Sequence, residues 1–235
     1  MALITASLNV PGSGAGNSTT ISSMDIQKTI QCTTGGIIDI QISNDGVTWV
    51  NIYRFKVAGS TVMNFFAKFI RTNVIEVDQS KTVAVNITAN TILTPLLTSS
   101  ATVPTTGNGS GIDVTNMGLT KTIYCTGSSE ESVDIQFSHD GTTYSHEFKL
   151  GAGQFLTLDA HCSKIRGVAL KADFRTTASI FIAGASQSAA STLSARPSAS
   201  AVGAGFFYFA TDASPPKPLW SDGNSWRDAA GNIVA

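Results

Sequence analysis

Charge is scarce in this sequence of 235 residues. Asp, Glu, Lys and Arg make up 13% of it, with 15 basic and 16 acidic residues and a formal net charge of −1, whereas soluble domains usually contain about 25%. No long run of one sign occurs. Because nucleic-acid binding normally needs a basic patch that displaces counterions, the composition disfavours a nucleic-acid partner.

Long apolar runs and export signals are also lacking. No window approaches the roughly 18 apolar residues of a membrane helix, so we expect no membrane partner. The start, MALITASLNV, has no basic region followed by a sustained apolar stretch, and we expect release by a route such as lysis. Cys32, Cys125 and Cys162 have no C-x-x-C spacing, so they are predicted to be reduced and buried.

An internal repeat is the strongest feature that is present. The segment KTIQCTTGGIIDIQISNDGVTW, from Lys28, returns from Lys121 as KTIYCTGSSEESVDIQFSHDGTTY, at an offset of 93 that grows by two after an insertion. So many ordered matches do not arise by chance. We therefore predict two tandem homologous copies, at 14–94 and 105–187.

Both copies are predicted to consist of strands. Apolar and polar residues alternate along 38–43 and again, in the same phase, along 133–138, which is typical of a strand with one buried face. Asp45-Gly46 and Asp140-Gly141 then supply hairpin-turn chemistry. The predicted fold class is all-β, with two tandem β-sandwich or small-barrel domains. An aromatic residue after each turn is expected to pack back across its hairpin: Trp49 and Tyr144.

The remaining segments differ in composition. We interpret 1–13 as an N-terminal arm and 95–104, rich in Thr, Ser and Pro, as a linker with room for a short edge strand. Residues 188–205, rich in Ser, Ala and Gly, are predicted to form a tether without a core of its own. Residues 206–235 are predicted to be an aromatic C-terminal module.

Catalytic and metal-binding patterns are weak. The three histidines, His139, His146 and His161, have no counterparts in the first copy, and a metal site needs several converging ligands. Asp39 and Asp134 are predicted to be polar groups on the solvent side of their strands. No nucleotide-binding loop or nucleophile elbow appears. We predict a non-enzymatic protein without metal or cofactor.

The C-terminal module holds the candidate partner-binding residues. Its aromatic area is too large for so short a segment to bury alone. Three interpretations stay open: anchors at a protein interface, where Trp and Tyr are enriched, a platform that stacks on sugar rings, or packing on the second domain. The predicted partner-binding residues are Phe206, Phe207, Tyr208, Trp220 and Trp226.

The tail also resembles a known group of proteins. An aromatic run leads to A-T-D at 206–212, and a proline-containing stretch leads to W-S-D-G-N-S-W at 220–226. This pattern resembles short modules of tailed-bacteriophage structural proteins, including head fibres, capsid decoration proteins and tail-fibre proteins. The phrase D-I-Q-x-S-x-D-G-x-T-W is similar to β-sandwich domains on phage virions. The resemblance implies a virion protein, commonly trimeric, with its β domains on the outer surface of the particle.

These features combine into one main hypothesis and two others. The chain is interpreted as a capsid decoration or cement protein that binds the major capsid protein, stabilises the outer capsid surface and forms a homo-oligomer, a trimer. The alternative is a fibre or tail-tip adhesin that binds host surface glycan. A glycan-degrading enzyme, which would need paired carboxylates about 5–10 Å apart, is the third.

Overall fold

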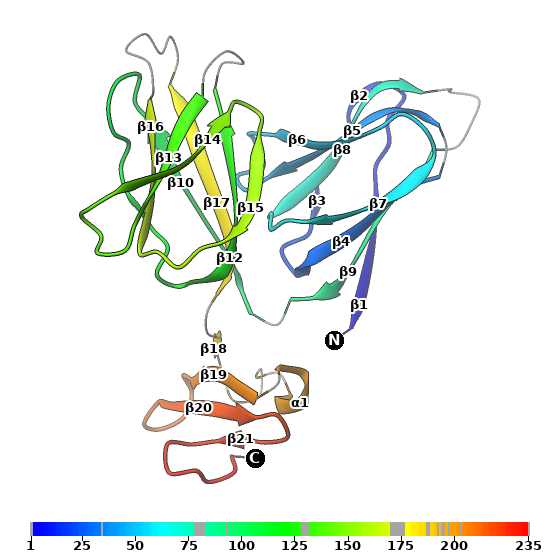
Figure 1. Cartoon of the computed structure of the whole chain (residues 1–235). Coiled ribbons are helices and arrows are strands. Elements are labelled where there is room, and N and C mark those ends of the chain that lie inside the picture. Colours follow the sequence, from blue (N-terminus) through cyan, green and yellow to red (C-terminus); the bar gives the residue numbers. More distant parts are fainter. Residues whose placement is uncertain are drawn as a thin grey trace.

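The computed structural model confirms the all-β prediction. It describes residues 2–33, 35–77, 83–92, 94–127, 132–169, 177–186, 189–191, 193, 196, 198–202 and 204–234, with the side chains of 189–191, 201–202 and 204–206 outside the description. Two sandwiches lie side by side, and a smaller C-terminal unit lies below them in the view of Figure 1.

The first sandwich has two sheets, in the strand orders β1-β9-β4-β7 and β2-β8-β5-β6, with β3 also paired to β8. Alternation along the strands points apolar side chains such as Ile30, Ile38 and Ile70 into a shared core. The strands are β1 (Leu3–Leu8), β2 (Gly14–Ala15), β3 (Thr19–Thr20), β4 (Met24–Cys32), β5 (Gly36–Ser43), β6 (Val50–Phe55), β7 (Gly59–Asn64), β8 (Phe69–Val77) and β9 (Val85–Thr91).

The second sandwich repeats this topology. Its sheets have the orders β10-β17-β12-β15 and β11-β16-β13-β14, and residues such as Ile123, Ile135 and Ile165 form the core. The strands are β10 (Leu96–Val103), β11 (Ile112–Asp113), β12 (Met117–Thr126), β13 (Ser132–Ser138), β14 (Ser145–Gly151), β15 (Phe155–Asp159), β16 (Lys164–Ala169) and β17 (Ala178–Ser186).

The predicted arm at 1–13 and linker at 95–104 contain full strands of the two sandwiches. β1 pairs with β9 over six residues, and β10 pairs with β17 over eight. Ile4 and Ala6 pack against the core, so the strand is held by its apolar face. The same offset of 93 aligns LITASLNV with LLTSSATV, which is the signal that the repeat extends to these segments.

The predicted tether at 188–205 likewise contains parts of the C-terminal unit. β18 (Ala189–Ser191) pairs in parallel with β19 (Ala204–Ala210), which pairs with β20 (Lys217–Asp222) and then β21 (Trp226–Arg227). The short helix α1 (Ala199–Val202) supplies Ala199 to a small core. The unit therefore has a core of its own, to which the segment 188–205 contributes Ala199 and the partly buried Leu193.

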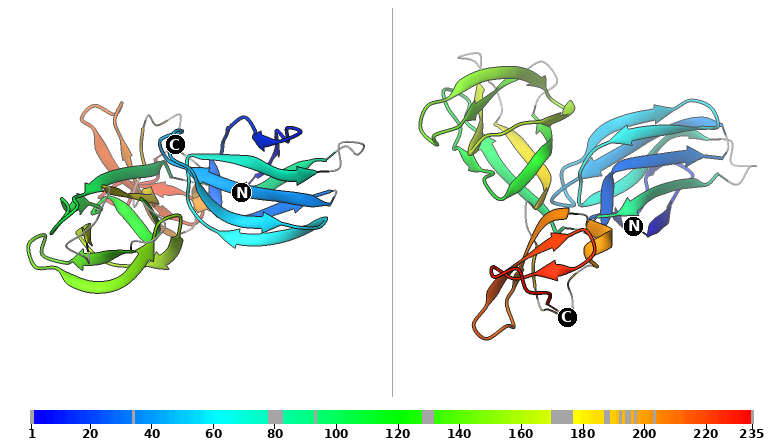
Figure 2. Two further views of the ribbon diagram at one scale, coloured as in Figure 1. Left: turned by 90° about the horizontal axis from the view of Figure 1, so that it is seen from above. Right: turned by 60° about the horizontal axis from the view of Figure 1, so that its bottom comes forward.

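A tyrosine joins the two sandwiches, which lie next to each other in the ribbon views of Figure 2. The Tyr124 hydroxyl accepts a hydrogen bond of 2.7 Å from the backbone N–H of Asn44, and Phe66 N–H donates to Thr122 Oγ1 at 2.7 Å. The Tyr124 ring stacks on Phe181, with 4.8 Å between centroids. Both rings are buried in the core of the first sandwich, so the junction is part of that core.

Each sandwich also contains a buried lysine at equivalent positions. Lys28 Nζ donates to the backbone oxygens of Asp25 (2.6 Å) and Phe65 (2.7 Å), and lies 4.5 Å from the centre of the Phe65 ring. Lys121 Nζ donates to the backbone oxygens of Gly118 (2.8 Å) and Ala160 (2.7 Å). Each lysine follows an irregular register in its strand and ties that bulge to the neighbouring loop.

We expect the variant Lys28→Met to reveal this buried amine through the pH dependence of stability. Burial, opposed in part by the Asp25 carboxylate, lowers the pKa of Lys28 from 10.5 to about 7. Between these values the unfolded chain binds more protons than the folded chain, so the free energy of unfolding rises with pH. Urea unfolding of the wild type should therefore show a rise from about pH 6.5 to 8.5 that the variant lacks. At the upper pH the variant should be less stable by about 1–3 kcal/mol, because two buried carbonyls lose their donor.

The matched control is Lys56→Met, which removes an exposed amine from the loop after β6. It should keep the slope of the wild type. Equal slopes for the wild type and Lys28→Met would contradict the assignment.

Candidate interaction surfaces

The C-terminal unit presents one apolar core face and one aromatic outer face. Alternation along β19 and β20 turns Tyr208 and Leu219, a cross-strand pair, into the core. It turns Phe207 and Trp220, the next pair, outward, where their rings meet edge to face at 5.7 Å between centroids. Trp220 is 39% exposed and Phe209, on the same side of β19, is 36% exposed. This face is an aromatic patch without a covering element in the described part of the unit.

The five predicted partner-binding residues are thereby divided. Phe207 and Trp220 lie on the outer face, as a partner site requires. Tyr208 and Trp226 are 1% and 4% exposed, and their rings lie 5.5 Å apart in the core, so they stabilise the unit rather than face a partner. The side chain of Phe206 lies outside the described residues. Phe209, which the sequence interpretation passed over, completes the outer face, and the alternation along 206–210 was the available signal.

A carboxylate-capped turn recurs in all three units. Asp45 Oδ1 accepts the N–H groups of Val47 and Thr48 at 2.8 and 2.7 Å. Asp140 does the same for residues 142 and 143, and Asp222 for residues 224 and 225. The glycine after each Asp has φ between 78° and 93°, which favours glycine. The common pattern D-G-x-[ST]-[WY] places this third turn in the same class, and the first two turns confirm the predicted hairpins.

The aromatic residue after each sandwich turn stacks on an arginine. The Arg71 guanidinium lies 4.1 Å from the centre of the Trp49 ring, and that of Arg166 lies 3.8 Å from the Tyr144 ring. Arg71 Nε also donates to the side-chain oxygen of Gln41 at 2.7 Å. Each ring therefore packs over its sheet on an arginine of β8 or β16, one strand beyond the hairpin across which it was expected to pack.

Asp39 and Asp134 are buried, contrary to the prediction of solvent-facing groups. Asp39 is 2% exposed because Arg54, opposite it on β6, covers it with a two-fold contact at 2.5 and 2.9 Å. Asp134 is covered in the second copy by His146, whose Nδ1 contacts its carboxylate. Long side chains across the strand thus bury groups that alternation alone would place in water.

The histidines and cysteines occupy separate places. His139 and His161 are exposed at one end of the second sandwich, whereas His146 lies on β14. Cys32 and Cys125 are buried as predicted, and Cys162 is half-buried. Among the described residues no group of three or more His, Cys, Asp or Glu side chains could hold a metal ion. Within the same residues no helix is long and apolar enough to cross a membrane.

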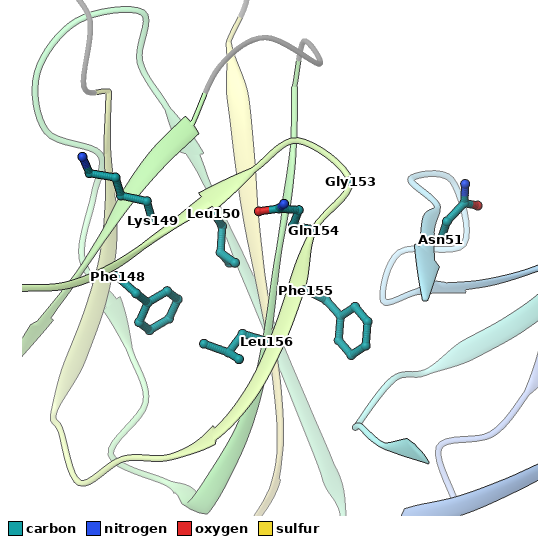
Figure 3. Close-up of a pocket in the computed structure, with 8 residues that line it drawn as sticks. All are labelled: Asn51, Phe148, Lys149, Leu150, Gly153, Gln154, Phe155 and Leu156. Carbon is teal, nitrogen blue, oxygen red and sulfur yellow. The ribbon is translucent and has the colours of Figure 1, made fainter. Parts of the chain in front are cut away.

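An open groove of about 490 Å³ lies between the sandwiches. Figure 3 shows Phe155 from β15 on one side and Asn51 from β6 on the other. Lys149 is the charged residue among those that line it, and none of the lining residues carries a carboxylate. Acid–base hydrolysis of a glycan uses two carboxylates, so the lining does not supply that chemistry.

Comparisons with known proteins leave the family open. No family model matches the chain, and no curated protein matches it. Solved structures with a similar arrangement include the PBSX exported protein XepA, 10% identical over 77% of this chain and 86% of that one, with a TM-score of 0.30. Another is the major capsid protein P2 of bacteriophage PM2, 12% identical over 78% and 98%, with a TM-score of 0.31. A third is the regulatory subunit of a cAMP-independent protein kinase A from Trypanosoma brucei. It is 10% identical over 78% of this chain and 74% of that one, with a TM-score of 0.21. Two of these three are phage proteins, but TM-scores this low support no conclusion about function.

We expect the Asp222 turn to make the C-terminal unit sensitive to acid. The N–H groups of Ser225 and Asn224, with Arg227, lower the pKa of Asp222 from 3.8 to about 2. A carboxyl whose pKa is lower in the folded state stabilises the fold above the unfolded value, and this stabilisation is lost as the pH falls through the folded value. The variant Asp222→Asn should therefore melt at a lower temperature than the wild type at pH 6, and the difference should shrink between about pH 4 and 2.

Tryptophan fluorescence during heating measures this, because Trp226 follows the turn and is buried. Glu76→Gln, which removes an exposed carboxyl from β8, is the control. A difference for Asp222→Asn that stays constant from pH 6 to 2 would show that the carboxylate does not act through its ionisation.

Proposed function

We propose that this protein is a non-enzymatic structural protein of a tailed-phage virion, a decoration protein that binds the major capsid protein on the outer capsid surface and assembles as a trimer. The observation that carries the proposal is the aromatic face of Phe207, Phe209 and Trp220 on a unit with its own core. Aromatic side chains bury a large area while losing few rotors, and they dominate protein interfaces for that reason.

The composition of the sandwiches supports the same role. The outward side chains of β1, β4 and β9 are mainly Thr, Ser, Asn and Gln, as in Thr5, Ser7, Thr29 and Gln31. Because this surface has no excess of positive or negative charge, it does not electrostatically repel copies of itself or the subunits of a capsid. Many modest contacts of this kind, rather than one catalytic residue, would oppose the outward pressure of packaged DNA.

A second function rests on the same aromatic face. Exposed Trp and Phe rings can stack on sugar rings, so a fibre or tail-tip adhesin that binds host glycan is the alternative. The two proposals differ in the partner of one surface. Binding of the isolated protein to host polysaccharide would favour the adhesin, and binding to bare capsids would favour decoration.

Quantitative mass spectrometry of purified virions tests the location. We expect one copy per major capsid protein subunit, or a simple fraction of that ratio, because a decoration protein follows the capsid lattice. A handful of copies per particle would overturn the capsid assignment and move the chain to a fibre or tail.

The variant Trp220→Ala tests the surface. We expect it to weaken binding to capsids that lack the protein by about tenfold or more, since a central aromatic anchor typically contributes about 2 kcal/mol, while the melting temperature stays unchanged. Trp226→Ala should instead unfold the C-terminal unit, because Trp226 is in its core. Tyr53→Ala, an aromatic residue 38% exposed on the first sandwich, is the matched control. Unchanged capsid affinity of Trp220→Ala would refute the anchoring role.

A further inference from the structure

The first sandwich has an exposed face whose equivalent in the second sandwich is buried at its centre, on β12 and β17, and open at its edges, on β10 and β15. Strand pairing in the sheet β1-β9-β4-β7 aligns two rows of outward side chains. These rows are Ser7–Asn86–Gln31–Ser60 and Thr5–Thr88–Thr29–Val62. They contain no charged side chain, and Val62 is the single aliphatic residue, 60% exposed. We call these eight residues the free face.

In the second sandwich the equivalent rows form the junction. The sheet β10-β17-β12-β15 aligns Ser100–Phe181–Tyr124–Phe155 and Thr98–Ala183–Thr122–Thr157. Tyr124, Thr122 and Ala183 are fully buried and Phe181 is 7% exposed. This face therefore already serves as a protein interface, and the surface that covers it is one end of the first sandwich.

That covering end has a free counterpart as well. On the first sandwich it includes Asn44 and Phe66, whose N–H groups donate to Tyr124 and Thr122. The loops containing Phe66 and His161 are equivalent, because Phe65 N–H bonds to Ile26 O just as Ala160 N–H bonds to Leu119 O. His139 follows Ser138 of a capped turn, as Asn44 follows Ser43. The free end of the second sandwich is thus formed by His139 and His161, both exposed.

We propose that the free end of one chain docks on the free face of a second copy, which repeats between chains the contact made within each chain. In this contact His161 would lie against Thr29, as Phe66 lies against the equivalent Thr122 within the chain. His139 would lie against Gln31, as Asn44 lies against the equivalent Tyr124. Such a head-to-tail contact closes into a ring or extends as a filament. A ring of three would be the trimer proposed above, although the contact does not depend on a capsid partner.

The polarity of the two free surfaces fits a reversible contact. The internal junction is permanent and aromatic, with Tyr124 and Phe181, as expected where a surface never meets water. Its counterparts are Gln31 and Asn86, and amide side chains keep a surface soluble until a partner arrives. Non-obligate interfaces are more polar than obligate ones for this reason. Assembly then depends on a high local concentration of chains.

Sedimentation velocity of the full chain with two arginine variants tests the proposal. Thr29→Arg blocks the free face and His161→Arg blocks the free end, and both side chains are exposed, so each variant should keep the melting temperature of the wild type. We expect the wild type to form species larger than a dimer as its concentration rises, and each variant alone to stay monomeric. An equimolar mixture of the variants should stop at a dimer, since only one intact face and one intact end remain in each pair.

The control Val47→Arg changes a residue that is 82% exposed on the first hairpin and should associate like the wild type. The series is repeated with Trp220→Ala in every chain, which removes the aromatic contribution, and association should persist there. A wild type that stays monomeric throughout, variants that still associate, a mixture without dimers, or loss of association with Trp220→Ala would each overturn the head-to-tail contact. None of these outcomes bears on whether the protein binds capsids, which the copy number decides.

Discussion

Strand register is the constraint on which the rest of this structure depends, and capped turns set it. A slip of one residue would move Ile38, Ile40 and Ile42 from the core to the surface. The Asp45 carboxylate opposes such a slip, because it accepts two N–H groups that otherwise lack partners in the turn. The same device recurs at Asp140 and Asp222. The same type of capped turn thus fixes the strand register, and with it the buried face, in three units whose cores differ.

The two sandwiches show how one fold can carry two kinds of surface. The inward positions stay apolar in both copies, as with Ile30 and Ile123. The outward positions differ, since Gln31 of the first copy occupies the position that Tyr124 occupies in the second. Tyr124 gains burial and a hydrogen bond only because a neighbouring sandwich covers it. The change from Gln31 to Tyr124 therefore marks a contact with a partner, whereas the buried lysines Lys28 and Lys121, identical in both copies, mark the fold.

Much of the architecture could be predicted from the sequence, because alternation and turn chemistry are local. The all-β class and the sandwich hairpins followed from 38–43 and 133–138. The strands Leu3–Leu8 and Leu96–Val103 lie in segments that the sequence predicts to be an arm and a linker, because Thr, Ser and Pro around the second segment favour a linker. The order within 188–205 was missed for a different reason. Ala199 and Leu193 of this segment pack against a core that the later strands β19, β20 and β21 create.

The candidate site was predictable in composition but not in orientation. An aromatic-rich tail indicates an interface or a small core. The composition of the tail does not show which rings lie in the core and which face a partner. Pairing resolved this, because β19 and β20 send Tyr208 to one side and Trp220 to the other. Asp39 and Asp134 illustrate the same limit, since their burial depends on Arg54 and His146 across the strand.

The aromatic face and the uncharged free face are suited to different parts of one task. Phe207 and Trp220 offer area that is released from water on contact, which supplies affinity. The rows around Thr29 offer little apolar area but carry no charge to desolvate, so they permit close approach without supplying much affinity. A chain with one strong anchor and one permissive face can bind a surface first and meet its neighbours afterwards. In that order a weak contact between copies suffices, because anchored chains already have a high effective concentration.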